Sequence, residues 1–283
     1  MTISQAATSG DYTLFTVYDD DPMNPREWDN FGKMVCWHRR YNLGDKHEYD
    51  DPDDFFKSLL EEMDIGKTLF RMLRKNQIPG VKLAYNRSER VWELSSYWDF
   101  KKSWGIDREY EPGLSAKNLP CDFVSDVLEL LGISDMVKIL KSVHGFILIP
   151  LYLYDHSGIT MSTGPFPCPW DSGCVGLTYA DAAMIQREYG EVNDGTIERA
   201  RKRLVSEVET YDLFLTGQCY GYALYEGENE TDSFYGFLGK YDVFLTDVES
   251  YLPENCKGMT ESLRDYCGDI ANYFWRQRLH TPA

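Results

Sequence analysis

The spacing of apolar residues predicts helices in five parts of the chain. Residues 53–74, 121–142 and 196–214 carry apolar side chains at three- and four-residue spacing, the period of an amphipathic helix. The second stretch contains a Gly-Ile-Ser break and predicts two short helices. The third begins with a threonine that suits an N-cap. Residues 180–190, which end in glycine, and residues 260–278 predict the remaining helices.

β-Branched and aromatic runs bounded by turn residues predict the strands. These runs cover residues 13–21, 32–41, 146–154, 174–179 and 218–226. The third run is apolar at both odd and even positions, which is typical of a central strand covered on both faces. Residues 1–10 are expected to form a flexible terminus.

A tryptophan-rich stretch, residues 80–112, alternates like strands and predicts a hairpin or small subdomain. We expect its tryptophans to be core or interface anchors. Together the elements predict an α+β fold with a mixed or antiparallel central sheet, an α-rich insertion and a C-terminal helix. In the expected domain organisation, residues 1–54 and 143–283 form a discontinuous core domain, and residues 55–142 form an α-rich, Trp-containing insertion.

The charge of the chain favours a basic partner. There are 46 Asp and Glu but only 29 Lys and Arg residues, which gives a formal net charge of −17. Such a charge opposes non-specific binding to a phosphate backbone, so we expect no direct contact with nucleic acid. Three acidic clusters are candidate partner-binding sites, although each is also typical of a solvated loop. They comprise Asp19, Asp20 and Asp21; Asp50, Asp51, Asp53 and Asp54; and Glu226, Glu228, Glu230 and Asp232.

Several classes of protein are not expected. The longest apolar run, residues 146–153, is far shorter than the roughly 20 residues that cross a bilayer. The first residues lack the pattern of a secretory signal, so we expect a cytoplasmic protein. Its seven scattered cysteines then predict reduced thiols rather than a disulfide framework. The chain has no Gly-rich nucleotide-binding motif, and we expect no cofactor.

One polar loop is a candidate for chemistry. Asp155 and His156 follow a predicted strand directly, and Asp171 arrives just before the next one. Carboxylate and imidazole groups bind divalent metals or act as acid and base, and His38 would join them if it lies alongside. The alternative is that the aspartates cap turns and that His156 bonds to a loop carbonyl. No known metal-ligand spacing decides between the two, and whether a metal binds stays open.

Long, unusual peptides lie on both sides of the expected insertion. They read NPREWDN, VCWHRRYNLGDKH, IPLYLYDHSGITMST, PCPWDSGCVGLTY and EVETYDLFLTGQCYGY. These motifs resemble a family of proteins carried by bacteriophages, plasmids and prophages. The resemblance covers a minority of the chain and implies no catalytic residue. It implies an accessory protein of a mobile element that acts inside the bacterial host cell.

The leading hypothesis is a binding protein rather than an enzyme. Proteins of mobile elements include acidic inhibitors of host defence of the anti-CRISPR, anti-restriction and anti-Gabija types. Acidic clusters would then occupy the basic nucleic-acid-binding surface of a defence nuclease complex. Exposed aromatic residues in GYALYE (221–226) and FYGFLG (234–239) would favour partner docking or a homo-oligomer. The alternatives are a metal-dependent hydrolase or nuclease that uses Asp155, His156 and Asp171, and a structural role in phage assembly.

Overall fold

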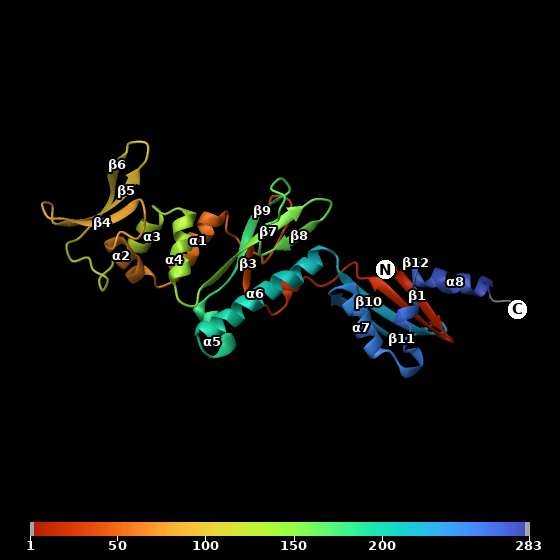
Figure 1. Ribbon diagram of the computed structural model, residues 1–283. Coiled ribbons are helices and arrows are strands. Elements are labelled where there is room, and N and C mark those ends of the chain that lie inside the picture. Colours follow the sequence, from red (N-terminus) through yellow and green to blue (C-terminus); the bar gives the residue numbers. More distant parts are fainter. Residues whose placement is uncertain (1–2, 281–283) are drawn as a thin grey trace. The chain divides into compact units, whose positions relative to one another are not determined.

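The computed structural model describes residues 3–280 and shows an α+β fold with antiparallel sheets and a C-terminal helix, as the sequence predicts (Figure 1). The chain divides into two compact units. Unit 1 comprises residues 1–45, 149–180 and 184–283, and unit 2 comprises residues 46–148 and 181–183. No helix within residues 3–280 has both the length and the apolar character needed to cross a lipid bilayer.

Unit 1 contains a five-stranded sheet whose strands come from both ends of the chain. Its strand order is β11-β10-β2-β1-β12. The elements are β1 (Ile3–Ser9), β2 (Tyr12–Tyr18), β10 (Cys219–Glu226), β11 (Asn229–Leu238), α7 (Tyr241–Tyr251), β12 (Arg264–Gly268) and α8 (Ile270–His280). On one face α7 covers a core that includes Leu14, Tyr220 and Phe244. On the other face residues of α8 pack against Phe15 and Val17.

The second sheet of unit 1 has the order β3-β9-β7-β8 and is covered by the longest helix (Figure 1). Its elements are β3 (Lys33–Cys36), β7 (Ile147–Asp155), β8 (Ile159–Ser162), β9 (Ser172–Ala180), α5 (Ala182–Tyr189) and α6 (Asp194–Leu215). Val208 and Tyr211 of α6 pack against Leu151 and Leu153. Asp212 also accepts hydrogen bonds from the Met161 amide and the Thr160 hydroxyl, which fastens α6 to β8.

A buried ion cluster holds the NPREWDN segment of unit 1 in place. Its short 3-10 helix η1 (Pro25–Glu27) carries Arg26, whose side chain is 2% exposed. The Arg26 guanidinium donates to both Asp45 carboxylate oxygens at 2.9 and 3.1 Å and to the Gly32 carbonyl at 2.9 Å. Its Nη1 lies 3.6 Å from Glu207 of α6, which in turn accepts hydrogen bonds from the Phe31 and Gly32 amides. The cluster therefore joins η1, the start of β3 and α6.

Unit 2 combines four helices with a three-stranded antiparallel sheet in the order β4-β5-β6. Its elements are α1 (Pro52–Glu62), α2 (Gly66–Arg74), β4 (Val81–Asn86), β5 (Val91–Trp98), β6 (Ser103–Tyr110), α3 (Phe123–Leu128) and α4 (Ile133–Ser142). The tryptophan-rich stretch thus forms the small sheet-containing part that its alternation predicts. Leu83 and Leu94 lie opposite each other and are buried.

Predictions for the two ends of the chain were partly wrong. Residues 3–9 are not a flexible terminus but strand β1, in which Ile3, Ala6 and Ala7 are buried. Alanine is depleted in strands, and the pairing that selects this one comes from β2 and β12. The helix expected over residues 260–278 begins only at Ile270, because the preceding residues pair with β1 as β12. Asp269 accepts a hydrogen bond from the Asn272 amide at this start.

Smaller differences concern element boundaries. The helix expected over residues 53–74 is divided into α1 and α2, and α6 is capped by Asn193, with Thr196 completing a capping box. The strand expected over residues 32–41 ends at Cys36. Strand β7 buries alternate residues and leaves the others half-buried, so only one of its faces is fully covered.

Candidate partner-binding site

Helix α7 covers only part of the five-stranded sheet and leaves its edge open. Phe244 of α7 packs on Tyr220 of β10 and on Phe237 of β11, with ring centroids 5.5 and 5.4 Å apart. Farther along β11, Phe234 lies opposite Tyr222 and is 51% exposed. Residues opposite each other in antiparallel strands share a face, so Phe234 belongs to the face that α7 covers. The helix and the edge strand therefore bound a groove rather than a closed core.

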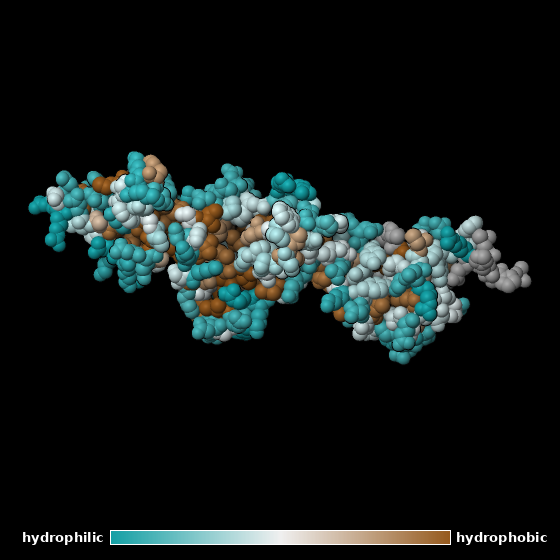
Figure 2. Space-filling model, turned by 45° about the horizontal axis from the view of Figure 1, so that its top comes forward, coloured by the Kyte–Doolittle hydropathy of each residue, from teal (hydrophilic) through white to brown (hydrophobic). Residues whose placement is uncertain are grey.

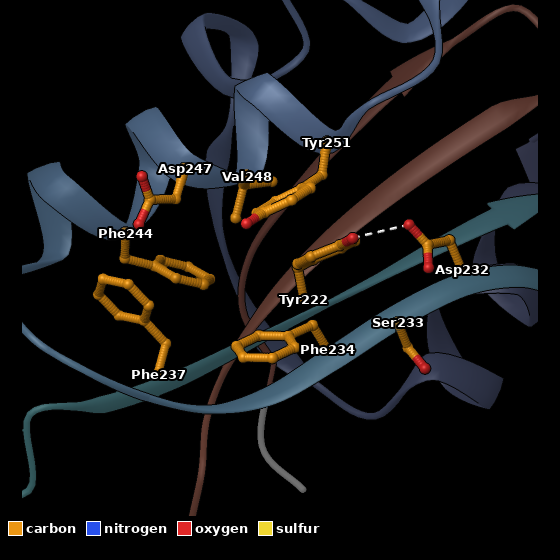
Figure 3. A pocket seen from close by; sticks show the side chains of 9 residues that line it. All are labelled: Tyr222, Asp232, Ser233, Phe234, Phe237, Phe244, Asp247, Val248 and Tyr251. Carbon is orange, nitrogen blue, oxygen red and sulfur yellow. Dashed lines mark hydrogen bonds between the residues drawn. The ribbon is translucent and has the colours of Figure 1, made fainter.

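We call this feature the aromatic groove, and it has a volume of about 570 Å³. Figure 3 shows α7 forming one wall and β11 the other. In the part of the molecule that holds these two elements, hydrophobic residues lie at the surface beside hydrophilic ones (Figure 2). The groove is lined by Tyr222, Asp232, Ser233, Phe234, Phe237, Phe244, Asp247, Val248 and Tyr251.

Carboxylates stand on both walls of the aromatic groove. Asp232 accepts a hydrogen bond of 2.7 Å from the Tyr222 hydroxyl (Figure 3). Burial, and then this bond, raises the pKa of Tyr222, so the phenol stays neutral and donates the bond. Asp247 is exposed on the α7 wall, and neither aspartate forms an ion pair with any residue in the described range 3–280. The groove is therefore apolar at its base and negative at its rim.

The same negative character extends over the β10–β11 hairpin. Glu226 accepts a hydrogen bond from the Tyr12 hydroxyl, and Glu230 accepts one from Tyr225. Burial, and then the bond to Glu230, raises the pKa of Tyr225 to about 12. The stretch from Cys219 to Leu263 contains only two basic residues against nine acidic ones, which are Glu226, Glu228, Glu230, Asp232, Asp242, Asp247, Glu249, Glu254 and Glu261.

The other two acidic clusters lie elsewhere. The first cluster, Asp19, Asp20 and Asp21, directly follows β2. Tyr12 at the start of β2 pairs with Glu226 beside the β10–β11 turn, and Tyr18 at its end pairs with Tyr220, so this cluster lies at the end of the sheet away from that turn. The cluster of Asp50, Asp51, Asp53 and Asp54 belongs to unit 2 and organises the start of α1. There Asp51 caps the helix by accepting a hydrogen bond from the Asp54 amide, and Asp53 pairs with Lys57 at 2.7 Å. This second cluster therefore has a local structural role.

The candidate catalytic residues meet at one end of the four-stranded sheet. The Asp155 amide donates to the Asp171 carbonyl at 2.8 Å, and His156 Nδ1 lies 3.5 Å from the Asp171 carboxylate. The Asp155 carboxylate accepts a hydrogen bond from Tyr41 at 3.2 Å and lies 3.4 Å from Arg40. His38, in the loop after β3, stacks on Tyr41 and accepts from the Arg40 and Tyr41 amides.

These contacts cross-link three loops through polar side chains. Asp155 has Arg40 and the Tyr41 hydroxyl as neighbours, and Asp171 has the His156 imidazole. Within the described part of the chain, no group of three or more His, Cys, Asp or Glu side chains is arranged to hold a metal ion. The contacts are bonds between side chains, and they differ from the turn capping and the bond to a loop carbonyl that the structural interpretation expected.

Sequence reasoning found part of the aromatic groove. It selected Asp232 by charge and the FYGFLG segment by its aromatic residues, and Phe234 of that segment is exposed. The GYALYE segment was expected to offer exposed aromatics too, but Tyr222 and Leu224 are buried because α7 covers that face of β10. Asp247 and Tyr251 were missed, since only the packing of α7 brings them opposite β11.

The comparisons with known proteins add no relative of this chain. No family model, curated protein or solved structure matches it.

Proposed function

We propose that this protein binds and inhibits a bacterial anti-phage defence nuclease complex. The aromatic groove and the acidic hairpin beside it would lie against a basic, nucleic-acid-binding surface of that complex. The observation that carries this proposal is the groove itself: an open apolar base whose two walls bear the carboxylates of Asp232 and Asp247.

A surface of this kind fits a partner rich in arginine and lysine. Aromatic side chains in a partly enclosed groove are the usual anchors of protein interfaces. An arginine that enters the groove would stack on Phe234 or Tyr251 and pair with a carboxylate on either wall. The surplus of acidic residues around the groove would speed association with a basic surface and weaken it with anionic ones.

The identity of the partner as a defence nuclease rests on two further supports. The motifs of unit 1 resemble proteins of bacteriophages, plasmids and prophages, for which inhibition of host immunity is a common role. A defence nuclease must expose a basic surface to hold its nucleic acid, and a net charge of −17 is complementary to such a surface. The proposed site of action is the cytoplasm of the bacterial host, where such nucleases operate.

The test is a pull-down of the tagged protein from bacteria that express a panel of defence nuclease complexes, followed by light scattering. We expect a stoichiometric complex with one nuclease, loss of its activity and protection of infecting phage. Phe234→Ser should weaken the complex at least about 30-fold, the effect of a buried aromatic anchor. Asp247→Lys should weaken it and reduce its dependence on salt.

A matched control is Glu61→Lys, which makes the same charge change at an exposed position of α1 in unit 2. It should leave the complex intact. Absence of a complex with every nuclease, together with absence of phage protection, would refute the proposed function. A complex that tolerates both groove substitutions would refute the assignment of the contact to the groove.

The metal-dependent hydrolase remains the second hypothesis from the sequence. The structure does bring Asp155, His156 and Asp171 to one place, but in contacts that tie loops together. Alanine substitutions at Asp155 and His156 separate the two hypotheses, since they should leave inhibition intact if the groove is the functional surface.

A further inference from the structure

The outer face of the three-stranded sheet in unit 2 presents aromatic rings. In antiparallel pairs, opposite residues share a face. Leu83 and Leu94 lie on the inner face, where Trp92 packs on Phe70 of α2 with ring centroids 6.2 Å apart. Tyr97 and Trp104 are opposite each other on the outer face, with centroids 5.5 Å apart, and Trp104 is 45% exposed.

A lysine ammonium group stands directly over one of these rings. Lys82, also on the outer face, places Nζ 4.3 Å from the centroid of Trp104. Lys82 forms no ion pair with any residue that the structure describes, so its charge is available to an anion that approaches the rings. A second ammonium, that of Lys101 in the β5–β6 turn, lies 4.1 Å from the centroid of Trp98, whose register places it on the inner face.

The surroundings of this sheet are basic in a chain that is otherwise acidic. From Lys67 in α2 to Arg108 in β6 there are ten Lys and Arg residues and four Asp and Glu residues. The stretch thus carries six positive charges in excess, whereas the whole chain carries a net −17. The expectation of no contact with nucleic acid rests on the whole-chain charge, and it does not apply to a part with the opposite sign.

The acidic residues of the outer face mark where this basic surface ends. Glu93 and Glu109 are opposite each other at the end of the sheet away from the β5–β6 turn. Glu93 also accepts a hydrogen bond from Asn86. The half of the face near the turn, with Tyr97, Trp104 and Lys82, is the part that suits an anionic ligand.

We infer that this half-face binds single-stranded nucleic acid. Exposed aromatic rings stack on bases, and the unpaired Lys82 ammonium beside them neutralises a phosphate, which is the combination that single strands require. A duplex hides the faces of its bases and would gain only the charge contacts. An acidic peptide would also use the lysines, but it has no planar bases to stack on Trp104. The rings therefore favour a single strand over either of these partners.

The test uses the full chain and fluorescence anisotropy of labelled oligothymidylate and oligouridylate of about 12 nucleotides. We expect binding with a Kd of roughly 10⁻⁶ to 10⁻⁴ M at moderate salt. Trp104→Ala should weaken it roughly 5- to 150-fold, and Trp104→Phe should weaken it less because a ring remains. The matched control is Trp170→Ala, which removes a 91% exposed tryptophan from the loop before β9 in unit 1.

A second variant tests the charge. Lys82→Ala should reduce the slope of log K against log salt by about 0.7, the value for one phosphate contact on a single strand. Lys202→Ala, an exposed lysine of α6, should leave the slope unchanged. Tighter binding of oligouridylate would assign the site to RNA and tighter binding of oligothymidylate to DNA, and either result supports the inference.

Three results would overturn it. The first is that neither oligonucleotide binds. The second is that Trp104→Ala and Lys82→Ala bind as the unsubstituted chain does while circular dichroism shows them folded. The third is that a duplex or a polyglutamate peptide binds as tightly as the single strands, because then charge alone accounts for the interaction.

Discussion

Replacing Arg26 by alanine should destabilise unit 1 strongly, because it removes the cation from a buried cluster. The guanidinium holds Asp45 through two hydrogen bonds and faces Glu207, and these two carboxylates are only 21% and 12% exposed. Without Arg26 both carboxylates lose their cationic partner in a largely buried site. Breaking a buried ion pair by removing one partner costs about 3–5 kcal/mol.

Two features of the cluster place the expected loss near the lower end of that range. Glu207 keeps hydrogen bonds from the Phe31 and Gly32 amides, and Asp45 keeps one from the Met34 amide, so neither carboxylate is left without a donor. Arg26 Nη1 is itself a buried atom with no hydrogen bond, which weakens the intact cluster. We therefore expect a loss of about 3 kcal/mol. For a unit of this size that corresponds to a fall in Tm of about 6–12 °C.

The assay is urea unfolding combined with amide hydrogen exchange, which locates the effect within the chain. Exchange should become faster in η1, β3 and α6, while β4–β6 of unit 2 should keep the protection of the unsubstituted protein. Lys202→Ala is the matched control, because its contact with Glu198 is exposed and 4.0 Å long, and it should change stability by less than about 0.5 kcal/mol. If Arg26→Ala changed stability by no more than this control, the buried ion cluster would not stabilise unit 1.

Three other predictions concern glycine, tyrosine and cysteine positions. In urea unfolding, Gly176→Ala should destabilise the four-stranded sheet by about 1–3 kcal/mol, because the new Cβ would lie 2.2 Å from the Val35 carbonyl oxygen. The control Gly173→Ala places its Cβ where no atom lies within 4 Å and should leave the stability unchanged. Melting curves should show the stability of the fold falling between about pH 10 and 12. The pKa of Tyr225 is raised on folding, so its contribution to stability is complete below the unfolded-state pKa and is lost as the pH rises through the folded-state pKa. Tyr225→Phe should make this fall in stability shallower, and an unchanged fall would contradict this account. Mass spectrometry after alkylation near pH 8 should find the exposed thiols modified well before the buried ones, and equal rates would contradict the burial; the exposed set is Cys121, Cys174 and Cys267, and the buried set is Cys36, Cys219 and Cys256.

Elements with strong local signals were predicted well from the sequence. Helix α6 has a capping box, a sustained helical period and a glycine beyond its end, so its existence follows from neighbouring residues alone. Strand β1 lacks such signals. Its residues form a strand because β2 and β12 pair with it, and β12 is more than 250 residues away in sequence. Non-local pairing of this kind leaves little trace in a local pattern.

The candidate sites likewise combine features that are visible in the sequence with features that depend on packing between distant segments. Charge identified Asp232 directly, because clusters of acidic residues are visible in the sequence. The aromatic groove itself depends on where α7 crosses the sheet, and nothing local predicts that Asp247 and Asp232 line the same groove. The tryptophans of unit 2 were expected to be core or interface anchors, and the sequence could not say which of them are exposed. Tyr97 and Trp104 share a face because β5 and β6 pair them, and this register is visible only in the structure.

The strand order of the five-stranded sheet also determines when unit 1 is able to form during translation. Gln5 bonds to Asp265, which the ribosome adds 260 residues later. At about 5–20 residues per second, Gln5 of β1 waits roughly 13–50 seconds for its partner in β12. An isolated hairpin is marginally stable, and its unpaired edges attract other strands. Residues 46–148 of unit 2, by contrast, emerge as one continuous segment. Chaperones should therefore be needed mainly for the β1–β2 hairpin, which stays without its neighbouring strands long after unit 2 is able to fold.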